Sequence, residues 1–466
     1  MATKKVKSKV RGLWLKRMGW TIVCLLLVVC PWPADNRHYS GSNYQTETLS
    51  NLIEKKIDAS NASNLLAGIA EIDISPPVGH PLAGYQAREL KQYTDIQSRC
   101  YGRALTLAQD SRRITILAAD LLTIHRSVAK AILDKAQLSA DEVYFTASHT
   151  HGGPGGYVDR FLEEIVLGKY NAKYVDDLTT KLAELIKRSR RELVQVEVGI
   201  LKTDASRLII NRIDKRMQAY GKLTALVFRE MDEMSADVVK KPLAVLVSFG
   251  AHPTIIGRHQ YHLSSGYPGA LVEQLKQLTG AKLVLFAAGA LGDASPKINK
   301  PKDRFERSRE YGKILAHTLA QKWGEVKYEQ EPVMRNNRLT VVMPPFRVTM
   351  GSRWRHSPIL TTWFFDRRSH IHVLQINNTV LAGFPGDYAG DLAFTLDKWF
   401  LKRGLELVPT SFNGDWLGYL ASSESFFNYS NYEVRDMNFY GPWAGEYLND
   451  LVKYVVRHQN PEVHNK

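Results

Sequence analysis

Apolar positions recur with two different spacings along residues 66–445. Short unbroken apolar runs are typical of buried strands, and apolar residues three or four positions apart are typical of helices with one buried face. The alternation of these patterns predicts an α/β fold, with one large domain built on a mixed sheet flanked by helices. Strands are predicted at Gly68–Asp73, Ile114–Ala119, Val143–Thr146, 194–200, 222–229, Leu243–Phe249, Lys282–Ala287 and His372–Ala382, and helices at 125–137, 172–190, 267–278 and 304–324.

The stretch 141–156, DEVYFTASHTHGGPGG, is the most unusual of these strand ends. A buried strand is followed directly by two histidines and a glycine-rich loop. Residues two apart in an extended segment point to the same side, so His149 and His151 can face one cavity. Imidazole is the commonest protein ligand for transition metals. The plain alternative is two loop histidines beside a turn.

Three more predicted strands end in glycine or proline together with a metal-binding or catalytic residue type. The residues are His252 after Leu243–Phe249, Asp293 and Ser295 after Lys282–Ala287, and Asp387 after His372–Ala382. In α/β sheets ligands bind outside the carboxyl ends of strands, and two histidines with a carboxylate match a catalytic zinc site. Each residue also has a purely structural alternative. His252 could cap a strand, Asp293 could cap a turn, and Asp387 could be the N-cap of a helix.

The first 33 residues have the pattern of an export signal. Seven lysines and arginines within residues 1–17 precede the apolar run Met18–Cys30. The run is short for a membrane span, which needs about 20 apolar residues. Because Pro31 follows instead of a small-residue cleavage site, we predict an uncleaved signal-anchor over 1–33 and an exported catalytic part; cleavage near Ala34 is the alternative. Residues 34–65 are polar without periodicity, which predicts a tether before a domain over 66–466.

The net charge of +15 favours anionic partners such as phospholipid headgroups. The basic residues are scattered and no nucleic-acid-binding motif is present, so we predict a membrane surface and no nucleic acid as partner. Within 343–370, aromatic residues alternate with arginines, a composition typical of a membrane interface. Packing of these aromatics on the domain is the alternative. The residues are Phe346, Met350, Trp354, Trp363, Phe364 and Phe365, with Arg347, Arg353, Arg355, Arg367 and Arg368.

Taken together, the motifs resemble the catalytic domain of the neutral, or non-lysosomal, ceramidases. They follow that family's order and cover most of residues 66–445. The resemblance implies a zinc-dependent amidohydrolase that splits ceramide or a related N-acyl lipid into a fatty acid and an amine. The motifs are Leu82–Tyr85, Ser148–Gly156, Ile210–Arg212, Ala251–Thr254, Gly292–Pro296, Phe384–Asp387, and the C-terminal Tyr419, Tyr432–Glu433 and Tyr440–Pro442.

The resemblance also implies a role for each matched residue. The zinc ligands would be His149, His252, Asp387 and Tyr419. The scissile carbonyl and its developing charge would be held by His151 and Arg212, joined by Tyr432, and Ser295 matches the family's nucleophile. A zinc-activated water would make a serine nucleophile unnecessary, so the residues alone leave both attacking groups open.

The sequence departs from the family at three points. Asp387 is one methylene shorter than the family's glutamate, and the stretch between Ser295 and Asp387 is shorter. The chain stops at residue 466, so no C-terminal immunoglobulin-like domain is expected. Alternatives are therefore a zinc hydrolase for another amide or ester, or a lipid-binding module without chemistry; the retained Arg212 and Ser295 argue against the latter. The sequence makes no prediction of the oligomeric state.

Overall fold

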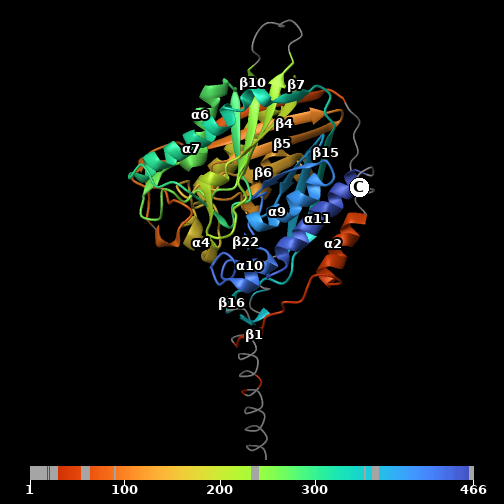
Figure 1. Cartoon of the computed structure of the whole chain (residues 1–466). Helices are drawn as coiled ribbons and strands as arrows, with labels where there is room; N and C mark the ends of the chain where they lie inside the picture. The colour runs from red at the N-terminus through yellow and green to blue at the C-terminus, as the bar shows by residue number, and fades with distance from the viewer. Residues whose placement is uncertain are drawn as a thin grey trace, which may run out of the picture.

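Two β-sheets lie face to face at the centre of the molecule, with helices on both outer sides (Figure 1). The computed structural model describes residues 18, 20, 30–53, 63–88, 91–231, 241–350, 353–358, 361 and 367–460. The larger sheet runs in the spatial order β12 (Leu283–Ala288), β10 (Pro242–Phe249), β9 (Lys222–Glu230), β7 (Val194–Asp204), β2 (Leu65–Asp73), β4 (Tyr101–Gln109), β5 (Arg112–Ala119) and β6 (Val143–Ala147), with β14 (Lys327–Glu329) paired to β7. The smaller sheet runs in the order β15 (Met334–Val342), β18 (Arg368–Ile376), β19 (Thr379–Gly383) and β21 (Glu406–Thr410).

Side chains that alternate along the strands separate into three cores. On β4, Leu105 packs between the two sheets with Leu374 of the smaller sheet, and Ala104 faces the helices on the other side. The outer face of the larger sheet is covered by α3 (Arg126–Ala136), α5 (Ala172–Ser189), α6 (Gly266–Thr279) and α7 (Arg304–Ala320). The smaller sheet is covered by α2 (Asn43–Ile53), α9 (Gly390–Leu401) and α11 (Ala444–Gln459).

The predicted fold class is confirmed, since β10 and β12 pair in parallel whereas most other neighbours in the larger sheet are antiparallel. The second sheet was not predicted. The run His372–Ala382, predicted as one strand, is the hairpin β18–β19. Its turn contains Asn377 at φ 53°, and asparagine is among the residues that adopt this left-handed conformation in two-residue hairpin loops.

The segment predicted as a polar tether, 34–65, contains the helix α2, which packs on the smaller sheet. Thr48 is buried, and its hydroxyl accepts hydrogen bonds from the Val342 amide at 2.9 Å and the Tyr447 hydroxyl at 2.8 Å. The structure therefore differs from the tether interpretation. Only a few side chains of α2 are buried, so its sequence shows no visible helical period and the helix was not predicted. The division into 1–33, 34–65 and 66–466 otherwise remains a prediction.

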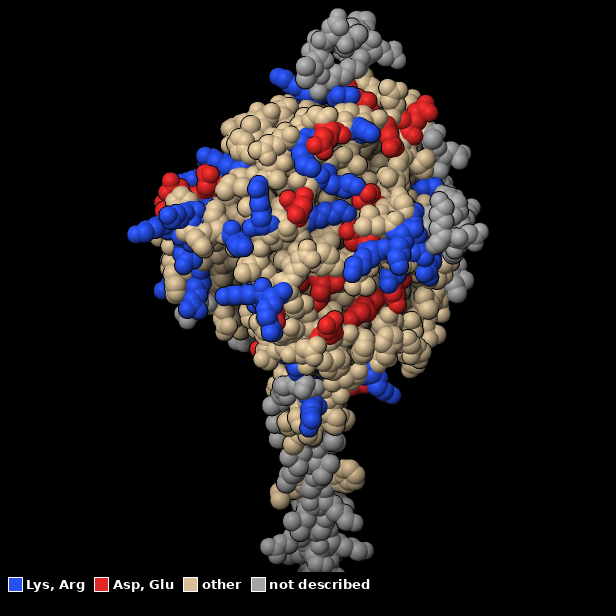
Figure 2. Space-filling model, in the orientation of Figure 1, with Lys and Arg blue, Asp and Glu red and all other residues tan. Residues whose placement is uncertain are grey.

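Most of the predicted signal-anchor lies outside the described residues, which include only 18, 20 and 30–33 of it. Within the described part of the chain, we find no helix of the length and apolarity that a membrane crossing requires. On the face drawn in Figure 2, lysines and arginines are spread among acidic side chains, as expected for scattered surface charge.

The described part of the stretch 343–370 divides between core and surface. Phe346 is buried and its ring stacks on Phe439 at 5.0 Å, so the packing alternative holds for this residue. Trp354 is 50% exposed. Trp363, Phe364 and Phe365 lie outside the described residues.

Residues 411–413, directly after β21, connect two edge strands of the larger sheet. The Ser411 amide donates to the carbonyl of Ala288 at the end of β12 at 2.7 Å. The Asn413 side chain donates to the carbonyl of Phe145 on β6, also at 2.7 Å. The carboxyl ends of strands that are distant in the sheet order therefore meet at one place.

Candidate metal centre

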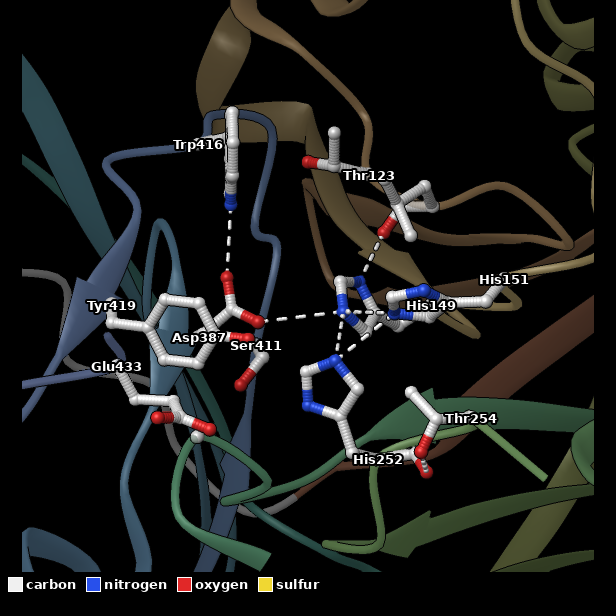
Figure 3. A network of polar contacts seen from close by, with 12 residues as sticks. Thr123, His149, His151, His252, Thr254, Asp387, Ser411, Trp416, Tyr419 and Glu433 are labelled. Atoms are coloured by element: carbon white, nitrogen blue, oxygen red, sulfur yellow. Dashed lines mark hydrogen bonds and ion pairs between the residues drawn. The ribbon is translucent and has the colours of Figure 1, made fainter. Parts of the chain in front are cut away.

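Three buried imidazoles point their Nε2 atoms at one another (Figure 3). The Nε2 atom of His252 lies 3.0 Å from that of His149 and 3.0 Å from that of His151, and the remaining pair is 3.3 Å apart. Zinc–nitrogen bonds of 2.0–2.1 Å in a tetrahedron place ligand atoms about 3.3–3.4 Å apart. The spacing is thus close to that of ligands around one ion.

His149 is held in an unusual conformation at the end of β6. Its φ is 57°, a left-handed value that is rare outside glycine and is often found at functional sites. The Nδ1–H donates to the carbonyl of Leu122 at 2.6 Å, and the ring stacks on Phe412 at 4.1 Å. With Nδ1 carrying the proton, the Nε2 lone pair is directed at the other two imidazoles.

The Leu82–Tyr85 motif makes room for His151. A Cβ on Gly84 would lie only 2.8 Å from the Nδ1 atom of His151, so any side chain here would collide with the imidazole. Gly84 also has φ 109°, a backbone conformation that favours glycine. Arg88 donates to the carbonyls of Ala83 and His151, which fixes the loop against the motif. His252 is fixed from the other side, since its amide donates to the carbonyl of Ala294 at 3.1 Å.

Asp387 and Tyr419 are brought together by a short parallel pairing. They are register partners in β20 (Asp387–Tyr388) and β22 (Tyr419–Leu420). The Oδ1 atom of Asp387 lies 3.4 Å from Nε2 of His149, and its Oδ2 accepts a hydrogen bond from the Trp416 indole at 2.9 Å. Oδ1 is buried and, within the described part of the chain, has no hydrogen-bond donor, as expected of an oxygen directed at a cation.

Arg212 links the remaining predicted residues. Its Nη2 donates to the Tyr419 hydroxyl at 2.8 Å, and its Nε lies 3.1 Å from Oε1 of the buried Glu433. The guanidinium carbon is 5.9 Å from the ring centre of Tyr432, which is 49% exposed. The site therefore reaches the surface beside Tyr432.

Asp293 and Ser295 have different positions although they are close in sequence. Asp293 accepts hydrogen bonds from the amides of Gly390 and Asp391 at 2.7 and 3.2 Å, so it caps α9 from a distance. The capping role considered for Asp387 thus belongs to Asp293. Ser295 is half-buried in β13 (Ala294–Pro296), opposite Ile210 of β8 (Ile209–Asn211).

Burial acts differently on the imidazoles and on the carboxyl group of the candidate site. Burial lowers the pKa of His149 to about 3 and holds the pKa values of His151 and His252 well below the ordinary value. The imidazoles are therefore neutral, which is the form that binds metals. Burial also raises the pKa of Asp387 to about 7, because an isolated carboxylate is unfavourable in this apolar setting. A divalent cation would offset that cost.

The chain is similar to known proteins in both sequence and fold. Residues 65–313, more than half of the chain, match the family described as neutral/alkaline non-lysosomal ceramidase, N-terminal. The chain belongs to this family. Neutral ceramidases of Drosophila pseudoobscura pseudoobscura and Drosophila melanogaster are 24% and 25% identical over 260 and 265 residues. Each match covers 50% of this chain and 36% of the relative, so the chain matches about a third of the length of these relatives.

Solved structures show the same fold. The neutral ceramidase from Pseudomonas aeruginosa superposes with a TM-score of 0.71 at 17% identity, covering 86% of this chain and 75% of that one. A ceramidase complexed with C2 gives a TM-score of 0.74 at 14% identity, covering 86% and 76%. This similarity extends the ceramidase fold beyond residue 313, across most of the described chain.

Three site residues were not singled out from the sequence. Trp416 orients Asp387, Glu433 pairs with Arg212, and Phe412 stacks on His149. Trp416 and Phe412 follow β21, which contains Pro409 and lies at a sheet edge, so its run lacks a clear strand pattern. Glu433 directly follows Tyr432 in one of the recognised motifs. Because a buried arginine such as Arg212 needs an acidic partner, this glutamate could have been predicted from the sequence.

The Trp416 indole is expected to tune metal affinity through Asp387. Replacing Trp416 with phenylalanine keeps an aromatic ring but removes the N–H that holds Oδ2. Loss of such an outer hydrogen bond weakens metal binding by about 10–100-fold. Zinc affinity of the purified variant, measured by chelator competition, checks this. The Trp399→Phe variant, changed on the surface of α9, serves as control, and equal affinities in both variants would contradict a role for Trp416.

Proposed function

We propose that this chain is a zinc-dependent amidohydrolase that cleaves the N-acyl amide of ceramide or a related N-acyl lipid, releasing a fatty acid and a sphingoid base. The observation that carries the proposal is the convergence of three buried imidazoles and the carboxylate of Asp387, in a member of a ceramidase family. The curated relatives are themselves named neutral ceramidases, which supports ceramide as the leading substrate.

The residues present fit a zinc ion well. Nitrogen donors and one carboxylate are typical zinc ligands, and the unsatisfied Oδ1 of Asp387 faces the imidazoles. We assign His149, His252 and Asp387 as ligands. The fourth donor is His151 by the observed spacing, or Tyr419 by resemblance to the family. When bound, zinc would polarise the amide carbonyl and lower the pKa of a water molecule.

Arg212 is placed to stabilise negative charge on the amide oxygen. Burial opposes its charge, but Tyr419, Tyr432 and Glu433 together hold its pKa above the ordinary value, so the guanidinium stays charged. Glu433 and the carbonyl of Gly292 fix its plane from one side. A fixed cation in a buried site stabilises a developing oxyanion far better than one in water.

Ser295 and Tyr432 complete the proposed machinery. Ser295 lies next to Ala294, whose carbonyl contacts the His252 backbone, so its strand adjoins the imidazoles. We assign it the nucleophilic or supporting role that the family resemblance implies. Tyr432, half exposed and near Arg212, is assigned to the entrance, where it would contact the substrate amide.

The N-terminal pattern supports an exported protein held at a membrane by residues 1–33. Seven basic residues ahead of the run Met18–Cys30 resemble a signal-anchor with its basic end in the cytoplasm. A lipid substrate in the bilayer would then be close to the enzyme. The substrate proposal and the membrane proposal are independent of each other, since an N-acyl lipid can also be presented in micelles.

The test of the proposed function is fatty-acid release from a panel of acylated compounds. The full chain, loaded with zinc, is incubated with N-acyl sphingosines, N-acyl amino acids and acyl esters, and products are measured by mass spectrometry. Release from N-acyl sphingosine, abolished by chelation, supports the proposal. Cleavage of only another amide or an ester would show that the substrate belongs to a different class. Binding without cleavage of any compound would identify a lipid-binding module.

With the three imidazoles and Asp387 as ligands, zinc affinity is expected to rise about tenfold per pH unit up to about pH 7 and to level off above it. Below pH 7 the metal-free Asp387 carries a proton, since burial raises its pKa to about 7, and zinc must displace that proton. The imidazoles add no slope near neutrality because their pKa values lie far lower. Chelator competition between about pH 5.5 and 8 measures the slope. In Asp387→Asn the slope should be absent; a persisting slope would assign the proton to another group.

A further inference from the structure

One end of the molecule gathers three segments that are far apart in sequence. β1 (Trp32–Pro33) pairs with β17 (Trp354–Arg355), which pairs with β16 (Thr349–Met350). In Figure 1, β1 and β16 lie at the lower end of the folded body, α10 (Ser423–Asn428) lies just above them, and the site strand β22 lies just above α10. The chain thus begins its fold at the end that also carries part of the candidate metal centre.

Specific contacts hold these segments together. The Ala34 amide donates to the carbonyl of Arg353 at 2.8 Å, and the Trp443 indole donates to the carbonyl of Asn36 at 2.9 Å. The rings of Trp443 and Phe427 are 6.3 Å apart, which joins α10 to the N-terminal segment. Thr349 donates to the carbonyl of Arg435, in the loop that also carries Tyr432.

The surface of this end is apolar and basic. Three large apolar side chains are strongly exposed here: Trp354 by 50%, Phe427 by 46% and Val348 by 37%. Arg353 is exposed and Arg355 half-buried beside them. We call the group Trp32, Val348, Arg353, Trp354, Arg355 and Phe427 the N-terminal face. Two strongly exposed aromatic side chains, Trp354 and Phe427, thus belong to segments that the contacts above hold together, and large apolar side chains gathered at one end of a protein indicate contact with another surface.

We propose that the N-terminal face docks on a lipid bilayer that contains anionic lipids, with the entrance to the metal centre beside the membrane. The N-terminal sequence of the chain indicates that a bilayer is the surface that this face contacts. The apolar run Met18–Cys30, preceded by seven basic residues, ends two positions before Trp32. Cys30, the last residue of that run, lies two positions before β1, so the run joins the folded part of the chain at this face. Tryptophan and phenylalanine suit the headgroup region, and arginine suits anionic headgroups.

The entrance follows from Tyr432. It is 49% exposed, its ring is 5.8 Å from that of Tyr419, and it is separated from Phe427 by only five positions in the chain. An N-acyl lipid leaving the bilayer at this face would therefore meet the candidate site without crossing open water. This step rests on the proposed function, whereas docking itself does not.

The first measurement needs no catalysis. The full chain is incorporated into vesicles of phosphatidylcholine and phosphatidylglycerol that contain brominated lipid, which quenches nearby tryptophans. Trp354→Phe should remove part of the quenchable emission, and Trp399→Phe, on α9 and outside the N-terminal face, should leave the quenched part unchanged. Quenching that is identical in wild type and Trp354→Phe would overturn the docking proposal.

The second measurement compares two substrates. In Trp354→Ser with Phe427→Ser, hydrolysis of vesicle-embedded N-acyl lipid should fall about tenfold or more, since two aromatic side chains no longer bury in the interface. Hydrolysis of a short-chain soluble amide should stay within about twofold, because the metal centre is untouched. The control is Leu278→Ser, an exposed apolar residue on α6.

The outcomes separate docking from the proposed function. Equal losses on both substrates would mean that the face supports the pocket, and equal retention would mean that another face meets the membrane. A change in oligomeric state in the variants, measured by light scattering, would assign the face to a second copy of the chain. If no protein cleaves either substrate, the proposed function fails, and the quenching result alone decides docking.

Discussion

Replacing His252 with alanine is expected to abolish zinc binding and hydrolysis together. The Nε2 atom of His252 lies 3.0 Å from the Nε2 atoms of both other histidines, so its removal takes away one of the nitrogen donors that would hold the ion. Loss of the ion removes several kcal/mol of transition-state stabilisation, and the rate should fall roughly a thousandfold or more. Metal content by mass spectrometry and the release of fatty acid are measured on the same sample.

The same experiment on His151 decides its role. If His151 is a ligand, His151→Ala loses zinc as His252→Ala does; if it holds the substrate carbonyl, the variant keeps zinc and loses activity. His317→Ala, an exposed histidine on α7, should keep both. Full activity in His252→Ala would remove this histidine from the mechanism.

Replacing Arg212 with glutamine is expected to lower both activity and stability. The guanidinium pairs with the buried Glu433, and a buried carboxylate left without its partner costs about 3–5 kcal/mol of unfolding free energy. Loss of the cation near the developing oxyanion should reduce kcat by about 10²–10³-fold. Denaturant unfolding and steady-state kinetics measure the two effects.

A double variant separates the two effects. Arg212→Gln with Glu433→Gln removes the unpaired charge, so most of the lost stability should return, whereas kcat should stay low. The single variant Glu433→Gln should keep the cation and lose much less activity than Arg212→Gln. Recovery of kcat in the double variant would mean that Arg212 acts only by holding the fold.

The strand ends were the most informative part of the sequence. The histidine–glycine loop after β6 and His252 after β10 were predicted to share one cavity, and their Nε2 atoms lie within 3.3 Å of each other. Asp387 was placed with them by the same argument, and its Oδ1 faces His149. Unbroken apolar strands followed by glycine and histidine leave few alternatives for where these side chains can lie. The roles assigned to these residues remain predictions.

The parts that could not be predicted depend on contacts between distant segments. Trp416 and Phe412 reach the centre only because residues 411–413 bind the ends of β6 and β12, which are at opposite ends of the sheet order. α2 is a largely polar helix that packs through a few side chains such as Leu52, so its sequence lacks a clear period. Such contacts follow from tertiary packing and not from local pattern.

The most direct test of the account is metal content together with metal-dependent amide cleavage by the purified full chain. The account predicts about one zinc ion per chain, fatty-acid release from N-acyl sphingosine, loss of that release on chelation, and its return when zinc is added back. Amide cleavage at an unchanged rate in protein shown to contain no metal would contradict it.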